Sequence, residues 1–316
     1  MRSNNKSLLI TMGDPAGVGP EVTAKALAKI CLDKKVQPVV IGNGDIWQQV
    51  WPVKGAGKKA PKPSFIHVAH STHVTHKPGV PTPASGKDAL LYLEKAVELI
   101  KAGQSLSLVT APVSKESISR FIPGFKGHTT YFANAFGLKN VEMLFVADDM
   151  KLVLVTRHVP LKAVPALITT RKVLDVIQTT HRFIVNRFKI KDPKIAVLGL
   201  NPHAGEGGHI GNEEIVAIVP AIKKARALGM NIQGPFPADT FFEPRHSTGY
   251  DLVVALYHDQ ALTALKALYF DRLVNVTVGL PFIRTSPAHG TAFGIAGRGI
   301  ADEGSMLAAL QLAVRL

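Results

Sequence analysis

Histidines follow three apolar segments that are distant from one another in the chain. The segments are Leu152-Val-Leu-Val-Thr-Arg-His158, Lys194-Ile-Ala-Val-Leu-Gly-Leu-Asn-Pro-His203 and Leu252-Val-Val-Ala-Leu-Tyr-His258. Each segment is typical of a buried strand, and α/β sheets bind ligands just beyond the carboxyl ends of their strands. Three imidazoles in that position could form a catalytic metal site with an open coordination position. One such histidine is more often structural, but three in equivalent places favour a metal site.

A second group of histidines recurs at every third residue, at His67, His70, His73 and His76. A 3₁₀ turn of that length would be unusual, and an extended chain would direct the side chains alternately to opposite faces. Val68, Val74 and Thr75 between them favour an extended chain, and no acidic residue is near to complete a site. We therefore do not expect this run to bind a metal, and its role stays open.

Two glycine-rich segments suit the approach of an anion to the backbone. Residues 11–21 join a predicted strand to a predicted helix, and residues 289–299 form a second loop of small residues. Glycines allow close backbone approach, and a helix N-terminus favours negative charge. Neither segment is G-x-G-x-x-G or a P-loop, and Ile41-Gly-Asn-Gly44 is only half of a dinucleotide fingerprint, which we interpret as a turn.

Other polar residues suited to phosphate are scattered along the chain: His128, Thr129, Lys266, Asn275 and Arg284. A single basic residue is usually part of the solvated surface. Arg284 differs because it lies among apolar residues close to the second glycine-rich loop.

Short apolar runs alternate with helical patterns, which predicts an α/β fold with a mainly parallel sheet. The predicted strands are Ser7–Met12, Pro38–Ile41, Leu106–Thr110, Met143–Ala147, Leu152–Thr156, Lys194–Leu200, Leu252–Leu256 and Leu273–Val278. Helices are predicted at Glu21–Ile30 after Pro20, and at Asp88–Ile100 with Ser85 as its cap and Asp88 in its first turn. Residues 55–83, rich in Gly, Pro, Lys and His, are predicted to be a surface loop.

The composition is that of a globular protein. The 316 residues are 46% hydrophobic, and 37 basic against 23 acidic side chains give a net charge of +14. The charge is spread out, and its densest part, residues 54–62, has no aromatic residue to stack on bases, so we favour small anions over nucleic acid as ligands. The single cysteine, Cys31, suits the cytoplasm. No apolar run approaches the ~18 residues of a membrane span, and Leu8–Met12 is too short for a secretory signal.

Six motifs occur in order between residues 11 and 292: TMGDPAGVGPE, TAPVSK, GHTTYFA, NPHAGEGGHIG, YHDQALTALK and VNVTVGLPFIRTSPAHGTA. The sequence closely resembles the 4-hydroxythreonine-4-phosphate dehydrogenases of pyridoxal 5′-phosphate biosynthesis. Its glycine-rich loops are also similar to those of the more distant isopropylmalate and isocitrate dehydrogenases. The resemblance implies two α/β/α lobes with the active site in a cleft between them. Lobe 1 would hold residues 1–127 plus 284–316 with the cofactor loops, and lobe 2 residues 128–283 with the metal ligands and the dimer interface.

The resemblance also implies roles for particular residues. A homodimer would share each active site, with one divalent ion (Zn, Co or Mg) bound by His158 and His203 of one subunit and His258 of the other. His128, Thr129, Lys266, Asn275 and Arg284 would bind the phosphate and carboxylate of the substrate. NAD or NADP would contact nine residues of the two glycine-rich loops: Gly13, Asp14, Gly17, Gly19, His289, Gly290, Thr291, Ala292 and Gly294.

The implied reaction is the oxidation of 4-phosphooxy-L-threonine at C3 to 2-amino-3-oxo-4-phosphooxybutanoate. This β-keto acid then loses CO₂ to give 3-amino-2-oxopropyl phosphate. Asp239 and Lys266 are both candidates for moving the hydroxyl proton. Related dehydrogenases often have an acidic residue at the position of Gly294, so we expect weak discrimination between NAD and NADP, unless another side chain near Arg298 fixes the ribose.

Two alternatives remain. A close relative would oxidise threonate or erythronate 4-phosphate by the same chemistry. A protein of another class would be a basic anion- or nucleic-acid-binding protein on an inactive scaffold, which the complete set of three histidines disfavours.

Overall fold

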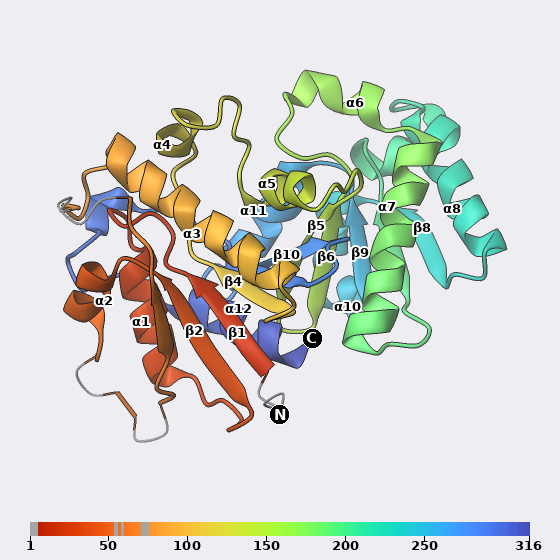
Figure 1. The fold of residues 1–316 in the computed structure, drawn as a ribbon. Helices are drawn as coiled ribbons and strands as arrows, with labels where there is room; N and C mark the ends of the chain where they lie inside the picture. Colours follow the sequence, from red (N-terminus) through yellow and green to blue (C-terminus); the bar gives the residue numbers. More distant parts are fainter. Residues whose placement is uncertain (1–5, 54–55, 58–59, 71–75) are drawn as a thin grey trace. The chain divides into compact units, whose positions relative to one another are not determined.

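The computed structural model describes residues 6–53, 56–57, 60–70 and 76–316 (Figure 1). The chain divides into two compact units, unit 1 with Met1–Val141 and Asp271–Leu316, and unit 2 with Glu142–Phe270. Each unit mixes helices and strands, as predicted for an α/β protein. Among the described residues, no helix has both the length and the apolar character needed to cross a membrane.

The unit boundaries differ from those of the predicted lobes, because residues 128–141 and 271–283 belong to unit 1. Two contacts within unit 1 explain the difference. The strand Val274–Val278 pairs with the strand Ile283–Pro287, and the Phe132 ring packs edge-on against Phe282 with 5.9 Å between centroids. As a result, His128, Thr129 and Asn275 share a unit with Arg284.

Unit 1 is built on a mostly parallel sheet. Its strands are β1 (Lys6–Thr11), β2 (Val36–Gly42), β3 (Ser64–His67), β4 (Ser107–Thr110), β10 (Val274–Val278) and β11 (Ile283–Pro287). Their order is β3-β2-β1-β4-β11-β10, and β10 and β11 run antiparallel to each other. The strands β1 and β4 at the centre are buried on both faces, which explains their unbroken apolar sequences.

Helices cover both faces of the unit 1 sheet (Figure 1). They are α1 (Gly19–Lys29), α2 (Gly44–Val50), α3 (Pro83–Lys101), α4 (Lys115–Ser119), α5 (His128–Ala135) and α12 (Gly304–Arg315), with a 3₁₀ turn η5 (Phe293–Ile295). Helix α3 packs on β1 and β2, whereas α12 packs on β4, β10 and β11. The strand predicted at Ser7–Met12 and the helix predicted at Glu21–Ile30 are confirmed within one or two residues.

The start of α3 corrects the prediction of a helix beginning at Asp88. The helix begins at Pro83, and Thr82 caps it by accepting a hydrogen bond from the Ser85 backbone N–H at 3.0 Å. In the reciprocal contact, Ser85 Oγ accepts a hydrogen bond from the Thr82 backbone N–H at 3.1 Å. Ser85 is therefore the third residue of the helix rather than its cap, and Asp88 lies beyond the first turn.

The segment predicted as a surface loop, residues 55–83, contains strand β3. This strand pairs in parallel with β2, and Phe65 stacks on Trp47 of α2 with 5.7 Å between ring centroids. Four residues at a sheet edge, between prolines and lysines, are too few to give a clear alternating pattern.

The strands of unit 2 are also mostly parallel. They are β5 (Glu142–Ala147), β6 (Met150–Leu154), β7 (Ile195–Leu198), β8 (Ile232–Phe236) and β9 (Leu252–Ala255), in the order β5-β6-β9-β7-β8. Only β5 and β6 among these described pairs are antiparallel. The apolar runs before His158, His203 and His258 form β6, β7 and β9, as predicted, and these strands are adjacent.

The helical elements of unit 2 are η1 (Leu161–Ala163), α6 (Val164–Leu167), α7 (Thr170–Phe183), η2 (Ile184–Phe188), η3 (Pro202–Gly208), η4 (Glu214–Ile218), α8 (Val219–Ala227), α9 (Ala238–Phe241), α10 (Pro244–Ser247) and α11 (His258–Tyr269). Helix α7 packs on β5 and β6, and α8 packs on α7 and β8. Helix α11 contacts β6 and β9 on the other side of the sheet (Figure 1).

Candidate functional site

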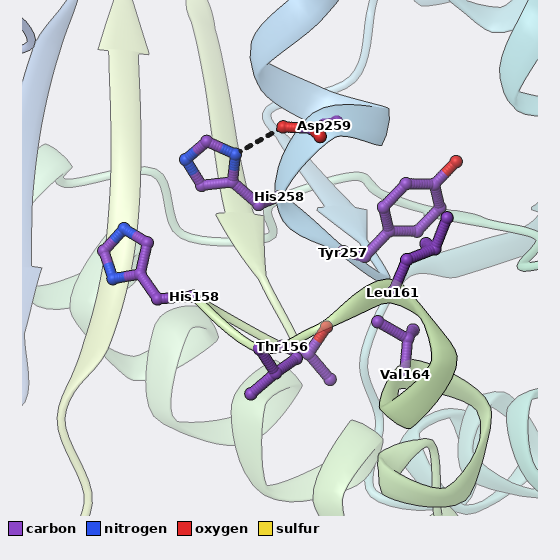
Figure 2. Close-up of a pocket in the computed structure, with 8 residues that line it drawn as sticks. Thr156, His158, Leu161, Val164, Tyr257, His258 and Asp259 are labelled. Atoms are coloured by element: carbon purple, nitrogen blue, oxygen red, sulfur yellow. Dashed lines mark hydrogen bonds and ion pairs between the residues drawn. The ribbon is translucent and has the colours of Figure 1, made fainter.

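The carboxyl ends of β6 and β9 bring two of the predicted metal ligands together. Hydrogen bonds continue the pairing beyond the strands, from Val155 N to Ala255 O at 2.9 Å and from Thr156 Oγ1 to Leu256 O at 2.7 Å. As a result, the rings of His158 and His258 lie 5.4 Å apart between centroids (Figure 2).

A small pocket of about 80 Å³ opens beside these two rings. It is lined by Thr156, His158, Val159, Leu161, Val164, Tyr257, His258 and Asp259 (Figure 2). Val159, Leu161 and Val164 are aliphatic, and the other lining residues supply two imidazoles, the Thr156 and Tyr257 hydroxyls and the Asp259 carboxylate. Such a volume suits an ion with one or two small ligands rather than a whole phosphorylated substrate.

The orientation of His258 is fixed by its neighbour in the chain. Its Nδ1 pairs with Asp259 Oδ1 at 2.7 Å, as the dashed line in Figure 2 shows. This contact directs Nε2 away from the carboxylate, the arrangement usual for a metal-binding histidine. His158 is held differently, because its backbone is left-handed with φ 45°.

His203 lies on the turn η3 and is not grouped with the other two histidines. Its side chain is 63% exposed, and its Nδ1 is 3.9 Å from Glu206 Oε2. Within the described residues of one chain, no group of three His, Cys, Asp or Glu side chains could hold a metal. Within one chain, His158 therefore lies beside His258. The expected ligand set instead took His158 and His203 from one subunit and His258 from the other. The structure holds one chain, so the division between subunits stays a prediction.

Unit 1 contains a buried cation, Arg284 on β11, which is 2% exposed. Its Nε and Nη2 donate to Thr110 Oγ1 at 3.1 and 2.5 Å, and its Nη1 donates to Thr277 Oγ1 at 3.1 Å. Within the described part of the chain no carboxylate pairs with this guanidinium. Burial lowers the pKa of Arg284 to about 9. A buried charge without a counter-ion is costly, so this environment is suited to receive an anion.

The buried polar atoms of unit 1 without a hydrogen-bond partner in the described structure include His128 Nε2 and Asn275 Oδ1. Burial lowers the pKa of His128 well below its usual value, and the positive charges of Arg284 and Lys115 lower it further. His128 is therefore neutral near pH 7, and it begins helix α5, where Thr129 follows it. The structure places His128, Thr129, Asn275 and Arg284 in unit 1, whereas Lys266 lies on α11 in unit 2.

The sequence interpretation missed two residues near Arg284 and His128, namely Thr110 and Lys115. Thr110 ends β4 and binds Arg284. Lys115 begins α4. Its Cε lies close to Gly127, the residue before His128, because a Cβ built on Gly127 would be 3.3 Å from that atom. The signal was present in the motif TAPVSK, which follows a strand directly.

The two glycine-rich loops lie side by side in unit 1. The Val18 N–H donates to Thr291 O at 2.9 Å, and a Cβ on Gly17 would lie 2.9 Å from the same oxygen. Gly13 (φ +74°) and Gly19 have no room for a side chain, since a Cβ would lie 2.3 Å from Pro112 O and 2.2 Å from Met12 O, respectively. Ala292 also has a left-handed backbone, with φ 44°.

Both loops carry buried polar atoms without a partner among the described residues, Asp14 Oδ2 and His289 Nε2. Burial raises the pKa of Asp14. Gly290 and Gly294 face open space, because nothing lies within 4 Å of a Cβ built on either. The two loops thus pack closely on neighbouring backbone and carry buried polar atoms without a described partner. Both features are consistent with the predicted cofactor loops.

The proton-transfer candidates differ in their surroundings. Asp239 is exposed on the short helix α9, and Lys266 is half-buried in the last turn of α11. Neither lines the pocket beside His158 and His258.

The run of recurring histidines does meet an acidic residue, which corrects the sequence interpretation. Asp88 of α3 pairs through Oδ1 with His70 Nδ1 and through Oδ2 with His76 Nε2, both at 2.7 Å. His67 ends β3, and its Nδ1 accepts from the Gly44 N–H at 3.0 Å. His73 lies outside the described residues. The carboxylate was missed because it lies on a helix 12 residues after His76.

An imidazole pair at strand ends, a buried arginine without a carboxylate partner among the described residues, and two glycine-rich loops are features expected of a dehydrogenase with an α/β fold. The chain belongs to the family described as pyridoxal phosphate biosynthetic protein PdxA, whose pattern matches residues 29–313.

Relatives of the same length support this assignment. The chain is 40% identical to the 4-hydroxythreonine-4-phosphate dehydrogenase of Zymomonas mobilis subsp. mobilis, over 98% of this chain and 95% of that protein. It is 42% identical to the enzyme of the same name from Aromatoleum aromaticum, over 98% and 96%. The crystal structure of 4-hydroxythreonine-4-phosphate dehydrogenase from Klebsiella pneumoniae is similar over 100% of this chain and 99% of that one, with 34% identity and a TM-score of 0.85.

Proposed function

We propose that this chain is an NAD(P)-linked 4-hydroxythreonine-4-phosphate dehydrogenase. It would oxidise the C3 alcohol of 4-phosphooxy-L-threonine to 2-amino-3-oxo-4-phosphooxybutanoate, which loses CO₂ to give 3-amino-2-oxopropyl phosphate. The observation that carries the proposal is the relationship over nearly the whole chain, at about 40% identity, to enzymes of that name. The hydride leaves C3, the hydroxyl proton goes to a base, and the carbonyl formed accepts the electrons released by decarboxylation.

The substrate's anionic groups would bind beside the buried Arg284 of unit 1. Arg284 supplies a preformed charge, because Thr110 and Thr277 already hold its guanidinium in place. Neutral His128 and the amide of Asn275 supply unpartnered polar atoms, and Thr129 a hydroxyl. Lys266 of α11 is a further candidate for substrate binding on the family resemblance alone. Bidentate contacts from an arginine match the geometry of phosphate or carboxylate.

The metal ligands would be His158, His203 and His258. The convergence of two imidazoles at one pocket fits a divalent ion, and three imidazoles suit Zn or Co better than Mg. When bound, the ion would act as a Lewis acid toward the C3 oxygen. The chain's own part is to orient the rings, through Asp259 at His258 and through the left-handed backbone at His158.

The cofactor would lie along the two glycine-rich loops. The first loop, with Gly13, Gly17 and Gly19, would lie along its phosphates, and the second loop, His289, Gly290, Thr291, Ala292 and Gly294, would hold its adenosine end. Asp239 and Lys266 remain the two candidates for the hydroxyl proton. The charge on the cofactor's phosphates also suits a chain with a net charge of +14.

We further propose a cytoplasmic homodimer in which two subunits complete each active site. The exposure of His203, away from the other two histidines, supports a ligand set that one chain does not complete. The single cysteine, Cys31, is exposed and unpaired, which suits a reducing compartment.

The test of the proposed function is NAD(P)H formation from defined substrates. The protein is treated with a chelator, dialysed, and assayed with 4-phosphooxy-L-threonine, threonate 4-phosphate and erythronate 4-phosphate, with and without added Zn²⁺, Co²⁺ or Mg²⁺. We expect metal-dependent turnover of the threonine derivative with the highest kcat/KM. Preference for a sugar-acid phosphate would assign the substrate to the alternative, and no turnover of any of them would reject the dehydrogenase.

A further inference from the structure

The turn that carries His203 has an unusual backbone. Five consecutive residues of η3, numbers 203–207, have φ values of 52°, 53°, 80°, 45° and 67°. Only two of the five are glycine, and other residues disfavour this left-handed region. A backbone of this kind persists only where the surrounding structure holds it, and it is common at functional sites.

The buried carboxylate of Glu214, 3% exposed, lies beneath this turn. Its Oε1 accepts hydrogen bonds from the backbone N–H groups of Leu200 and Asn201, at 2.7 and 2.8 Å. Its Oε2 accepts from Asn201 Nδ2 at 2.9 Å. Glu214 thus fixes the two residues at which the chain leaves β7 and enters the turn.

The glycines of the motif leave room for the carboxylate. A Cβ on Gly205 would lie 2.7 Å from Glu214 Oε2, and a Cβ on Gly199 would lie 3.2 Å from Oε1. Close packing from both sides leaves the carboxylate little freedom to move. The turn and Glu214 are therefore packed against each other, although Glu214 lies 11 positions after His203 in the sequence.

A second side chain, that of Gln260, connects the turn η3 to the strand that leads to His258. Gln260 Nε2 donates to Gly199 O at 2.6 Å, and Gln260 Oε1 accepts from the Leu256 N–H at 2.7 Å. Gln260 thus joins the carboxyl ends of β7 and β9, which already pair in parallel. The turn that carries His203 is held relative to the strand end before His258.

We propose that Glu214 is a positioning residue for His203: its carboxylate holds η3, and with it the imidazole, in one conformation. The inference rests on the proposed function, in which His203 binds the metal. Glu214 acts through hydrogen bonds to Leu200 and Asn201, and no contact with substrate, cofactor or metal is assigned to it.

The test compares Glu214→Gln with Glu213→Gln. The first variant keeps one oxygen for the two backbone N–H groups but places an amino group opposite the Asn201 amide. The second makes the same change at the neighbouring carboxylate, since Glu213 Oε2 accepts from Asn201 Nδ2 at 2.7 Å and a glutamine oxygen can still accept there, and it leaves the backbone contacts of Glu214 intact. Each full-length protein is measured for Co²⁺ binding by visible absorption, thermal unfolding of the metal-free form, kcat, and KM for NAD.

We expect Glu214→Gln to weaken Co²⁺ binding about 10- to 100-fold, the usual effect of losing a partner that orients a metal ligand. The kcat should fall while KM for NAD stays the same, and Glu213→Gln should behave like the wild type. A lower thermal midpoint with unchanged Co²⁺ affinity of the folded protein would show that Glu214 is merely structural and would overturn the proposal.

His203→Ala separates this inference from the proposed function. If His203→Ala weakens Co²⁺ binding and Glu214→Gln does not, the metal site stands and the positioning role is overturned. If His203→Ala binds Co²⁺ like the wild type, His203 is not a ligand, and both the ligand assignment and this inference are rejected.

Discussion

Arg284 is the residue of unit 1 whose surroundings most favour an anionic ligand. Its charge is buried and its described hydrogen-bond partners are hydroxyls, which stabilise a cation less than a carboxylate does. The protein therefore carries a charge that contributes little to its own folding. That cost is understandable if an anionic ligand provides the missing counter-ion.

This reasoning predicts opposite effects of Arg284→Met on binding and on stability. Methionine is an unbranched apolar side chain without the charge, so KM for the phosphorylated substrate should rise roughly 10- to 100-fold, as for the loss of a charge-assisted hydrogen bond worth about 1.5–3 kcal/mol. KM for NAD should not change. The free energy of unfolding should stay equal or increase, because replacing a buried charge by an apolar group is often stabilising. Steady-state kinetics and urea unfolding measure the two effects.

Inorganic phosphate provides the control for Arg284. It should raise the thermal midpoint of the wild type and have a smaller effect on Arg284→Met. An unchanged substrate KM in this variant would place Arg284 outside the substrate site.

Gly294 offers a test of cofactor choice, because a Cβ added there meets nothing within 4 Å. In Gly294→Asp the carboxylate could accept from the ribose hydroxyls of NAD and would repel the 2′-phosphate of NADP. We expect the ratio of kcat/KM for NAD to that for NADP to rise about tenfold, which corresponds to about 1.4 kcal/mol. Gly294→Asn, with the same shape and no charge, should have a smaller effect. A wild type that already prefers NAD about a thousandfold, with no change in Gly294→Asp, would exclude Gly294 from cofactor choice.

At the scale of elements, helix α3 binds two histidines that precede it in the chain, because its Asp88 pairs with His70 and His76. The His76 and Asp88 side chains are each 1% exposed, and that of His70 is 16% exposed. Burial alone would raise the pKa of Asp88, but hydrogen bonds from His76 and from His70 outweigh burial and hold its pKa below the usual 3.8. A carboxyl group whose pKa is lowered on folding stabilises the protein above that usual value, and this stability is lost as the pH falls through the lowered pKa.

Asp88→Asn should therefore destabilise the protein by roughly 2–4 kcal/mol at pH 7, the cost of leaving buried partners of a carboxylate unpaired. At acid pH, as the pH falls below 3.8 and through the lowered pKa of Asp88, the difference from the wild type should shrink because the carboxyl group is itself protonated. Urea unfolding at pH 7 and at acid pH measures it. Asp45→Asn, an exposed residue in the first turn of α2, is the control and should cost little at either pH. A loss that does not depend on pH would show that the charge of Asp88 is unimportant.

At the scale of the whole molecule, the proposed sharing of the site between subunits can be tested by mixing inactive variants. His158→Ala, His203→Ala and His258→Ala are each expected to abolish turnover and to lower metal content. If His258 comes from the partner, the mixtures that contain His258→Ala should regain activity, because one complete site forms per heterodimer. The mixture of His158→Ala with His203→Ala should stay inactive.

Each other outcome of the mixing experiment identifies a different arrangement. Recovery only in the mixtures that contain His203→Ala would mean that His158 and His258 act from the same chain, in which they are neighbours, and that His203 is supplied by the partner. No recovery in any mixture, with subunit exchange shown independently, would mean that the three ligands belong to one chain.

The sequence by itself determined the class of fold and the position of the three histidines at strand ends. Continuous apolar runs such as Leu252–Leu256 encode buried parallel strands in their own residues, so their ends could be located from local pattern alone. Long motifs then connected those ends to a family. The short edge strand β3 and the early start of α3 were missed, because their patterns are weak or depend on a reciprocal cap.

Only the tertiary structure decided which of these residues meet. Arg284 and Thr110 are separated by 174 positions, and their contact follows from the pairing of β11 with β4. Asp88 reaches two histidines because α3 packs beside the segment that carries them, and His158 meets His258 because β6 and β9 are adjacent. Local sequence fixes the conformation of a segment, but contacts between distant residues depend on strand order and register, which no single segment encodes.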